Sequence, residues 1–265
     1  MGEESTWFDF LPGLSNLKHV LEQQLGRVEP GQGFYFRWQM FGESHFTLAH
    51  VFGVLLVLAF IIVGGLAYRG AVSKGGEAAI VPPSRFGLRN LFEMFSEAVL
   101  SVSEGVMGPK NARRYLPLIG TLAFFIFFSN VLALIPGFVP PTSTLKTNLA
   151  LAVTVFVLTH FFGVREHGLA YFKHFLGPSP ALAPLMLPIE LVSHIARPVS
   201  LSVRLMGNMM ADHKVVMSFF ALVPIIVPLP FMLLGLLVCL IQALVFTTLT
   251  MVYISMAIEH EHDDH

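Results

Sequence analysis

Long apolar runs separated by short polar stretches dominate the chain from residue 46 onward. A helix needs about 20 mostly apolar residues to cross the hydrocarbon core of a bilayer. By length and apolar content, the runs predict about five transmembrane helices: residues 46–68, 115–135, 149–164, 188–220 and 223–258. We therefore expect an all-α membrane protein.

A sixth segment, residues 87–107, has a different pattern. Its apolar residues recur at helical spacing, whereas Glu93, Glu97 and Glu104 share the opposite side. This pattern is typical of an amphipathic helix that lies at the membrane interface or packs on other helices.

Composition supports a membrane protein, since 54% of the residues are hydrophobic and only 12% are charged. Soluble domains carry about 25% charged residues. The net charge of -1 gives no reason to expect a nucleic-acid partner. A single cysteine, Cys239, excludes an internal disulfide framework and a multi-cysteine zinc site. We expect no bound cofactor or metal.

Basic residues predict which side of the membrane each loop faces. Residues 69–114 carry seven Lys or Arg, whereas the turn at 136–148 carries only Lys146. We therefore expect an extracytoplasmic N-terminal segment over 1–45, without a cleavable signal peptide, and a membrane domain over 46–258. The acidic, His-rich tail over 259–265 should be cytoplasmic.

The segment 188–220 is the least ordinary of the five. A helix of this length extends for about 50 Å, against a hydrocarbon core of about 30 Å. Each charge at membrane depth costs about 2.5–3.5 kcal/mol. The segment nevertheless carries many polar or charged residues, namely Glu190, Arg197, Arg204, Asn208, Asp212, His213 and Lys214. We expect a strongly tilted helix, packed against the last helix and reached by water from different sides.

The residues around Arg204 carry a resemblance. The stretch Arg-Pro-Val-Ser-Leu-Ser-Val-Arg-Leu-Met-Gly-Asn-Met, which begins at Arg197, resembles the signature of subunit a of rotary F-type ATP synthases. Residues 242–255 resemble the last helix of that family, and residues 140–143 resemble its hairpin turn. The likeness covers roughly residues 45 to 260.

The resemblance implies a proton-translocating subunit of the Fo sector in a bacterial plasma (inner) membrane. Such a subunit stands beside a ring of c subunits, each with a membrane-embedded carboxylate, and provides two offset half-channels to that carboxylate. Its partners are the c-subunit ring, the subunit b stator stalk, the remaining F1Fo subunits and the lipid bilayer. ATP chemistry occurs elsewhere in the complex, so the chain is not expected to be an enzyme on its own. It has no phosphate-binding Gly-rich loop.

The family's essential arginine corresponds to Arg204. A guanidinium stays protonated and lowers the pKa of a nearby carboxyl group. It can thus help the ring carboxylate release its proton and prevent a direct leak between the half-channels. By family position, the remaining proton-translocation residues are Asn208, His213 and Gln242 in the outer half-channel and Glu190 and Ser193 in the inner one.

This sequence departs from common family patterns in the outer half-channel. It has His213 beside Asp212 where many members have an acidic residue, and Gly235 where others have His or Glu. Asp212 or His160 could substitute for the missing group.

A secondary ion transporter is the alternative. It would predict repeated halves with broken helices, and the sequence contains no such repeat. An intramembrane metalloprotease would need a His-Glu-x-x-His motif, which is not present.

Overall fold

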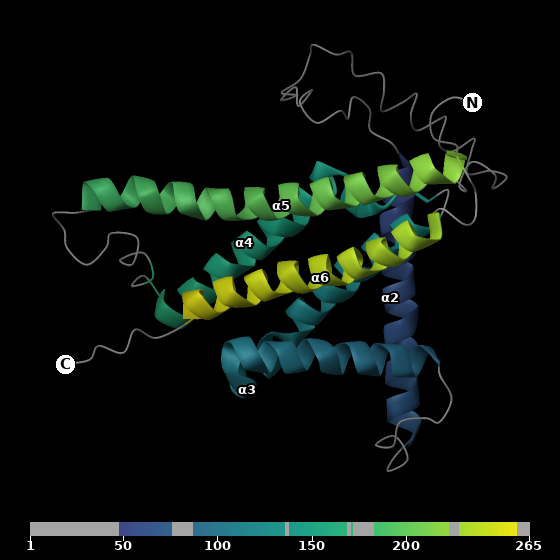
Figure 1. Ribbon diagram of the computed structural model, residues 1–265. Coiled ribbons are helices and arrows are strands. Elements are labelled where there is room, and N and C mark those ends of the chain that lie inside the picture. The colour runs from purple at the N-terminus through teal and green to yellow at the C-terminus, as the bar shows by residue number, and fades with distance from the viewer. Residues whose placement is uncertain are drawn as a thin grey trace.

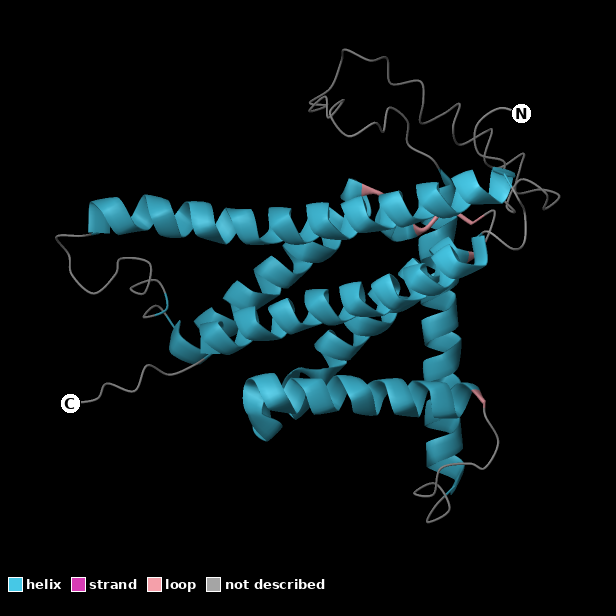
Figure 2. Cartoon of the chain, in the orientation of Figure 1, coloured by secondary structure: helices cyan, strands magenta, loops and turns pink. Residues whose placement is uncertain are grey.

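The computed structural model describes residues 48–75, 87–135, 138–168, 171, 183–222 and 228–258, where every regular element is a helix. The expected N-terminal segment 1–45 and tail 259–265 lie outside the described residues. The elements are α2 (Leu48–Gly75), α3 (Leu88–Val131), η4 (Leu132–Leu134), η5 (Pro141–Ser143), α4 (Leu145–His167), α5 (Ala183–Leu222) and α6 (Pro228–Ile258). In Figure 2 the described part of the chain is almost entirely helix, with a few short loop segments.

Helices α5 and α6 run across the molecule at a steep angle to α2, as Figure 1 shows. Helix α6 packs against α3, α4 and α5, whereas α2 packs chiefly on α3. The expected packing of a long inclined helix against the last helix is therefore present.

Four helical stretches in the described part are long and apolar enough to cross a membrane: His50–Gly70, Leu88–Leu134, Leu145–His167 and Pro228–Ile258. The all-α membrane fold is thus confirmed. Helix α5 is also long, with 40 residues, and it carries several charged side chains. It begins five residues before the predicted start at 188, and Pro188 lies inside it. Membrane helices tolerate such a proline because neighbouring groups satisfy the freed backbone.

Helix α3 contains two of the expected elements, separated by a bend at Gly108. This glycine has φ 75° and ψ 161°, a conformation that a residue with a Cβ adopts only with strain. Pro109 follows it and suits the first turn of the next helical segment. The amphipathic segment therefore ends at 107, and the following span starts before the predicted residue 115.

An aromatic cluster joins α2 to both parts of α3. The rings of Phe92 and Phe124 stack at 4.7 Å between centroids, and Phe60 meets Phe128 edge-on at 4.8 Å. Gly64 of α2 makes room for this contact, because a Cβ there would lie 2.2 Å from the Phe92 ring. These phenylalanines pack the helices against one another.

The turn between α3 and α4 holds a buried polar network. The hydroxyl of Thr142 donates to the side-chain oxygen of Asn130 at 2.7 Å, and the Asn148 amide donates to the Thr142 carbonyl at 2.7 Å. All three residues are fully buried. Since an unpaired buried polar group costs about 1–3 kcal/mol, these bonds fix the shape of the turn.

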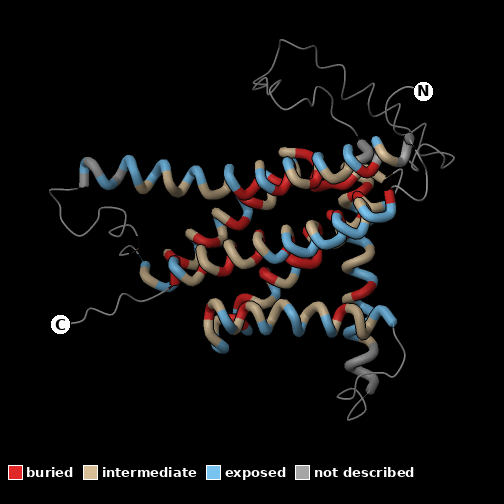
Figure 3. Tube along the Cα trace, viewed as in Figure 1, coloured by how far each residue is buried: buried red, intermediate tan, exposed pale blue. Residues whose placement is uncertain are grey.

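The two halves of α5 differ in how far their side chains are buried. Figure 3 shows its buried residues gathered in the second part of the helix, where Leu201, Leu205 and Met209 pack into the core. Before Leu201, the described side chains are exposed or half-buried. The polar residues of α5 therefore differ in their surroundings along the helix.

Candidate functional site

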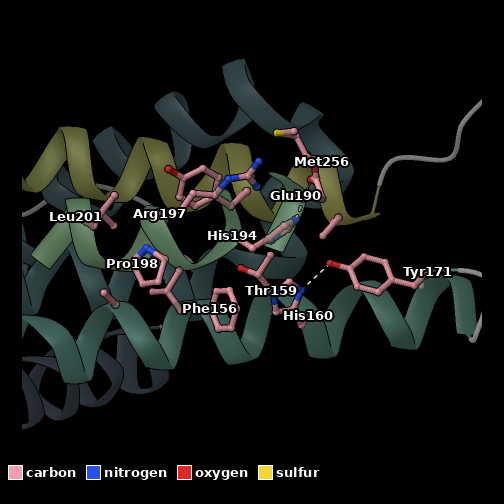
Figure 4. Close-up of a pocket in the computed structure, with 14 residues that line it drawn as sticks. Phe156, Thr159, His160, Tyr171, Glu190, His194, Arg197, Pro198, Leu201 and Met256 are labelled. Carbon is pink, nitrogen blue, oxygen red and sulfur yellow. Dashed lines mark hydrogen bonds and ion pairs between the residues drawn. The ribbon is translucent and has the colours of Figure 1, made fainter. Parts of the chain in front are cut away.

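A cavity of about 130 Å³ lies between the C-terminal ends of α4 and α6 and the N-terminal part of α5. Figure 4 shows the side chains that converge on it. Its lining consists of Ala152, Val155, Phe156, Thr159, His160, Tyr171, Glu190, His194, Arg197, Pro198, Leu201, Tyr253, Met256 and Ala257. Its polar groups come from three helices and from the segment after α4.

Glu190 and His194 form the first polar pair in the cavity. They lie one helical turn apart on α5, a spacing that brings side chains together. Nε2 of His194 is 3.1 Å from a carboxylate oxygen of Glu190. The side chain of His194 is only 15% exposed and that of Glu190 is 43% exposed. The carboxylate is therefore the more exposed member of the pair, and the imidazole is the more buried one.

His160 and Tyr171 form the second polar pair. Nδ1 of His160 is 2.7 Å from the Tyr171 hydroxyl, and the rings of His160 and His194 are 5.2 Å apart. Burial raises the pKa of Tyr171 above its ordinary value, so its hydroxyl keeps its proton at neutral pH. Gly163 makes space for the tyrosine, because a Cβ there would lie 2.5 Å from its ring.

Arg197 joins α5 to α6 at the same cavity. Its guanidinium carbon lies 5.2 Å from the centroid of the Tyr253 ring, which is within cation–π range. The charge of this arginine is therefore held against an aromatic face inside the protein.

Arg204 has the opposite setting. It is exposed, although Leu205 and Met206 beside it are buried. No described residue forms a hydrogen bond or ion pair with its guanidinium. Gly207 and Ala211 follow on the same side of the helix and are also exposed. Arg204 thus projects from a surface formed by small side chains.

Asp212 and His213 lie further along α5, about 12 Å beyond Arg204 by helical rise. Both are half-buried, as is Asn208. One carboxylate oxygen of Asp212 is buried and has no hydrogen-bond partner among the described residues. Asp212 lies near the buried Cys239 of α6. This carboxylate therefore lies between α5 and α6, rather than on the open face.

Metal binding has no support in the described part of the chain, where no three His, Cys, Asp or Glu side chains converge as ligands. The arrangement instead offers groups that exchange protons. A carboxylate and two imidazoles lie at one end of α5, a carboxylate and an imidazole lie towards the other end, and a permanent cation lies between them.

The comparison with known proteins decides the family. A sequence model described as "ATP synthase A chain" matches residues 46–255. This chain belongs to the ATP synthase A chain family. "ATP synthase subunit a 1" of Syntrophotalea carbinolica is 57% identical over 220 residues, which are 83% of this chain and 90% of the relative. "ATP synthase subunit a" of Bdellovibrio bacteriovorus is 45% identical over 232 residues, which are 86% of this chain and 99% of the relative.

The resemblance found around Arg204 is therefore confirmed. As an ATP synthase A chain, the protein is a component of the Fo sector and an integral membrane protein of a complex for proton transport and ATP synthesis.

The predicted site residues of this ATP synthase A chain do not form a single cluster. Glu190 lies in the cavity and Ser193 is half-buried one turn away, about 21 Å and 17 Å before Arg204 by helical rise. Gln242 is half-buried in α6. His160, considered as a substitute in the outer half-channel, instead lies with Glu190 and apart from Asp212.

Two members of the cavity, His194 and Tyr171, were not singled out from the sequence. The spacing of Glu190 and His194 is a readable signal, since residues four apart meet on a helix. No comparable signal identifies Tyr171, because its contact depends on the path of the chain after α4. Gly235 packs against η4, where a Cβ would approach Leu134 to 3.0 Å. The larger side chains of other family members would require Leu134 to move.

Proposed function

We propose that this chain conducts protons to and from a rotating ring of c subunits, with Arg204 at the contact with the ring. The observation that carries the proposal is the setting of Arg204: a permanent cation, exposed at the middle of a membrane helix and unpaired among the described residues. An arginine in this position is costly unless a partner supplies the opposite charge.

The surface beside Arg204 suits a closely packed partner. Ser200, Gly207 and Ala211 are small and exposed, and small residues let helix backbones approach in membranes. A ring carboxylate that approaches there would be favoured in its ionised form, because a nearby guanidinium lowers the pKa of a carboxyl group. Arg204 would therefore promote proton release on arrival of each c subunit.

Two routes would serve this contact from opposite ends of α5. The inner half-channel runs through the cavity with Glu190, and Ser193 lies one turn along. The outer half-channel runs past Asn208, Asp212 and His213 and includes Gln242 of α6. Arg204 lies between them and blocks direct passage, because it repels a proton that would cross without boarding the ring.

The remaining elements of the proposal follow from this role. Residues 46–258 form the membrane domain, with residues 1–45 outside and the tail 259–265 in the cytoplasm of a bacterial cell. The chain catalyses no reaction itself. Its partners are the c-subunit ring, the subunit b stator stalk and the other F1Fo subunits.

ATP-driven proton pumping in inverted membrane vesicles tests the proposal. The Arg204→Ala variant should lose pumping while the ring still copurifies with the chain. Lys214→Ala, which removes an exposed cation ten residues further along the same helix, should pump normally. Normal pumping in Arg204→Ala would overturn the proposal.

A further inference from the structure

We propose that His194 and His160 form a two-imidazole proton relay that extends the inner half-channel beyond Glu190. The inference rests on the proposed function and adds two proton-carrying residues to it. Figure 4 shows both imidazoles directed into the same cavity, from α5 and α4 respectively.

Continuity of the polar contacts carries the argument. A carboxylate oxygen of Glu190 lies 3.1 Å from Nε2 of His194, and the centroids of the His194 and His160 rings are 5.2 Å apart. Nδ1 of His160 lies 2.7 Å from the Tyr171 hydroxyl. The cavity of about 130 Å³ that both rings line has room for water beside them, and such water can bridge their nitrogens. The groups therefore form a connected series from α5 to the segment after α4.

Polar groups from α5, α6 and the segment after α4 face the imidazoles, although apolar side chains of α4 also line the cavity. Glu190 and Arg197 face His194 from α5, and Tyr253 contributes from α6. Tyr171 orients the ring of His160 through Nδ1. An imidazole that packed only as an apolar ring would not need these partners. A histidine also exchanges protons readily near neutral pH, since its ordinary pKa is about 6.5.

Each transfer in the relay moves one proton. Glu190, protonated by a proton that left the ring, passes it to Nε2 of His194 and returns to the carboxylate. His194 then carries a proton on each ring nitrogen and releases the one on Nδ1 through water to Nε2 of His160, whose Nδ1–H donates to the Tyr171 oxygen in this step. His160 releases a proton to the solution at the end of α4. Both imidazoles return to the neutral form. Water then moves the remaining proton of His194 from Nε2 back to Nδ1, so that Nε2 can accept again, and reversal of the steps admits a proton.

Passive proton flux tests the relay in inverted membrane vesicles stripped of the F1 sector. A potassium diffusion potential drives the flux, and a pH-sensitive dye records it from about pH 5.5 to pH 8.5, on both sides of the ordinary imidazole pKa. The variants are His194→Gln, His160→Gln and the double variant. Glutamine keeps hydrogen-bonding capacity but carries no exchangeable imidazole proton. His167→Gln is the control, because His167 lies in the last turn of α4 but does not line the cavity.

We expect His194→Gln to lower the proton flux about tenfold near neutral pH. This loss is smaller than the full effect of removing a positioned acid–base group, because water in the cavity provides a bypass. The pH profile should lose its imidazole titration. The double variant should be little worse than His194→Gln, since residues in one series are not additive. Added imidazole, which is small enough for the cavity, should restore flux to His194→Gln.

Wild-type flux and pH profile in both single variants would overturn the relay. A reduced flux with an unchanged pH profile and no rescue by imidazole would also overturn it, because that result indicates a structural role. If His194→Gln fails to assemble with the ring, the same criteria apply to His160→Gln. Failure of the proposed function is distinct: it is normal ATP-driven pumping in Arg204→Ala.

Discussion

Two arginines on α5, seven residues apart, show how one membrane helix holds charge in two ways. Arg197 lies in the cavity against Tyr253, beside the Glu190–His194 pair. Arg204 lies on the exposed face without a partner among the described residues. The first charge has an aromatic partner within the chain. The second remains for a neighbouring subunit to compensate, which is why we assign Arg204 to the ring contact.

Replacing each arginine by glutamine gives the largest expected difference. Arg204→Gln should lower ATP synthesis by at least about 100-fold, the loss typical of removing a group that stabilises charge at a reacting centre. Arg197→Gln should lower it only a few-fold, because a cation–π contact contributes about 0.5–2 kcal/mol. ATP synthesis by energised vesicles measures both. Equal losses would remove the distinction between the two settings.

The Asp212–His213 end of α5 extends the comparison to a third setting. Asp212→Asn should lower proton flux about tenfold, because the half-buried carboxylate can no longer exchange a proton. His213→Gln should act in the same direction. Lys214→Gln is the matched control on the neighbouring, exposed position. Flux in Asp212→Asn equal to that of the control would exclude Asp212 from the outer half-channel.

The hydrogen bonds of the hairpin turn lie within the chain, so their loss should affect stability rather than conduction. Thr142→Val removes the donor to Asn130 and should cost about 1–3 kcal/mol of stability. Thermal unfolding of the purified complex in detergent measures the change. Thr154→Val is the control, because the Thr154 hydroxyl is exposed and bonds only to the carbonyl of Ala150. A similar small loss in both variants would contradict the importance of the buried network.

Two adjacent glycines of α2 give the smallest and most specific contrast. Gly64→Ala places a Cβ 2.2 Å from the Phe92 ring, whereas Gly65→Ala meets nothing within 4 Å. Overpacking costs about 1–3 kcal/mol, and the movable ring favours the lower end. The thermal midpoint of the complex should fall for Gly64→Ala alone. Equal midpoints would show that α2 does not pack on α3 as closely as described.

Much of the fold was predictable because apolar length and helical periodicity determine where helices form in a membrane. The ends were less predictable. The predicted end of the amphipathic segment at residue 107 coincides with the bend at Gly108, but the following span was predicted to start only at residue 115, whereas the helix resumes directly after the bend. The start of α5 before Pro188 likewise depends on local packing.

The candidate site was predictable only along single helices. The stretch around Arg204 lies on one helix, so its residues and their order could be recognised directly. The contact of His160 with Tyr171 and its approach to His194 depend on how α4 is rotated and placed against α5. Sequence periodicity indicates which face of a helix is apolar, but not the height at which two helices meet.

The central claim, that the face bearing Arg204 meets the ring, is tested most directly by disulfide cross-linking. Gly207→Cys lies on that face, where an added side chain meets nothing within 4 Å in the chain, and Gly65→Cys on α2 is an equally open control. Both are made after Cys239→Ala removes the native thiol. A cysteine one turn from the c-subunit carboxylate should cross-link to residue 207 and stop ATP-driven pumping until the disulfide is reduced. Cross-linking to residue 65 but not to residue 207 would contradict the account.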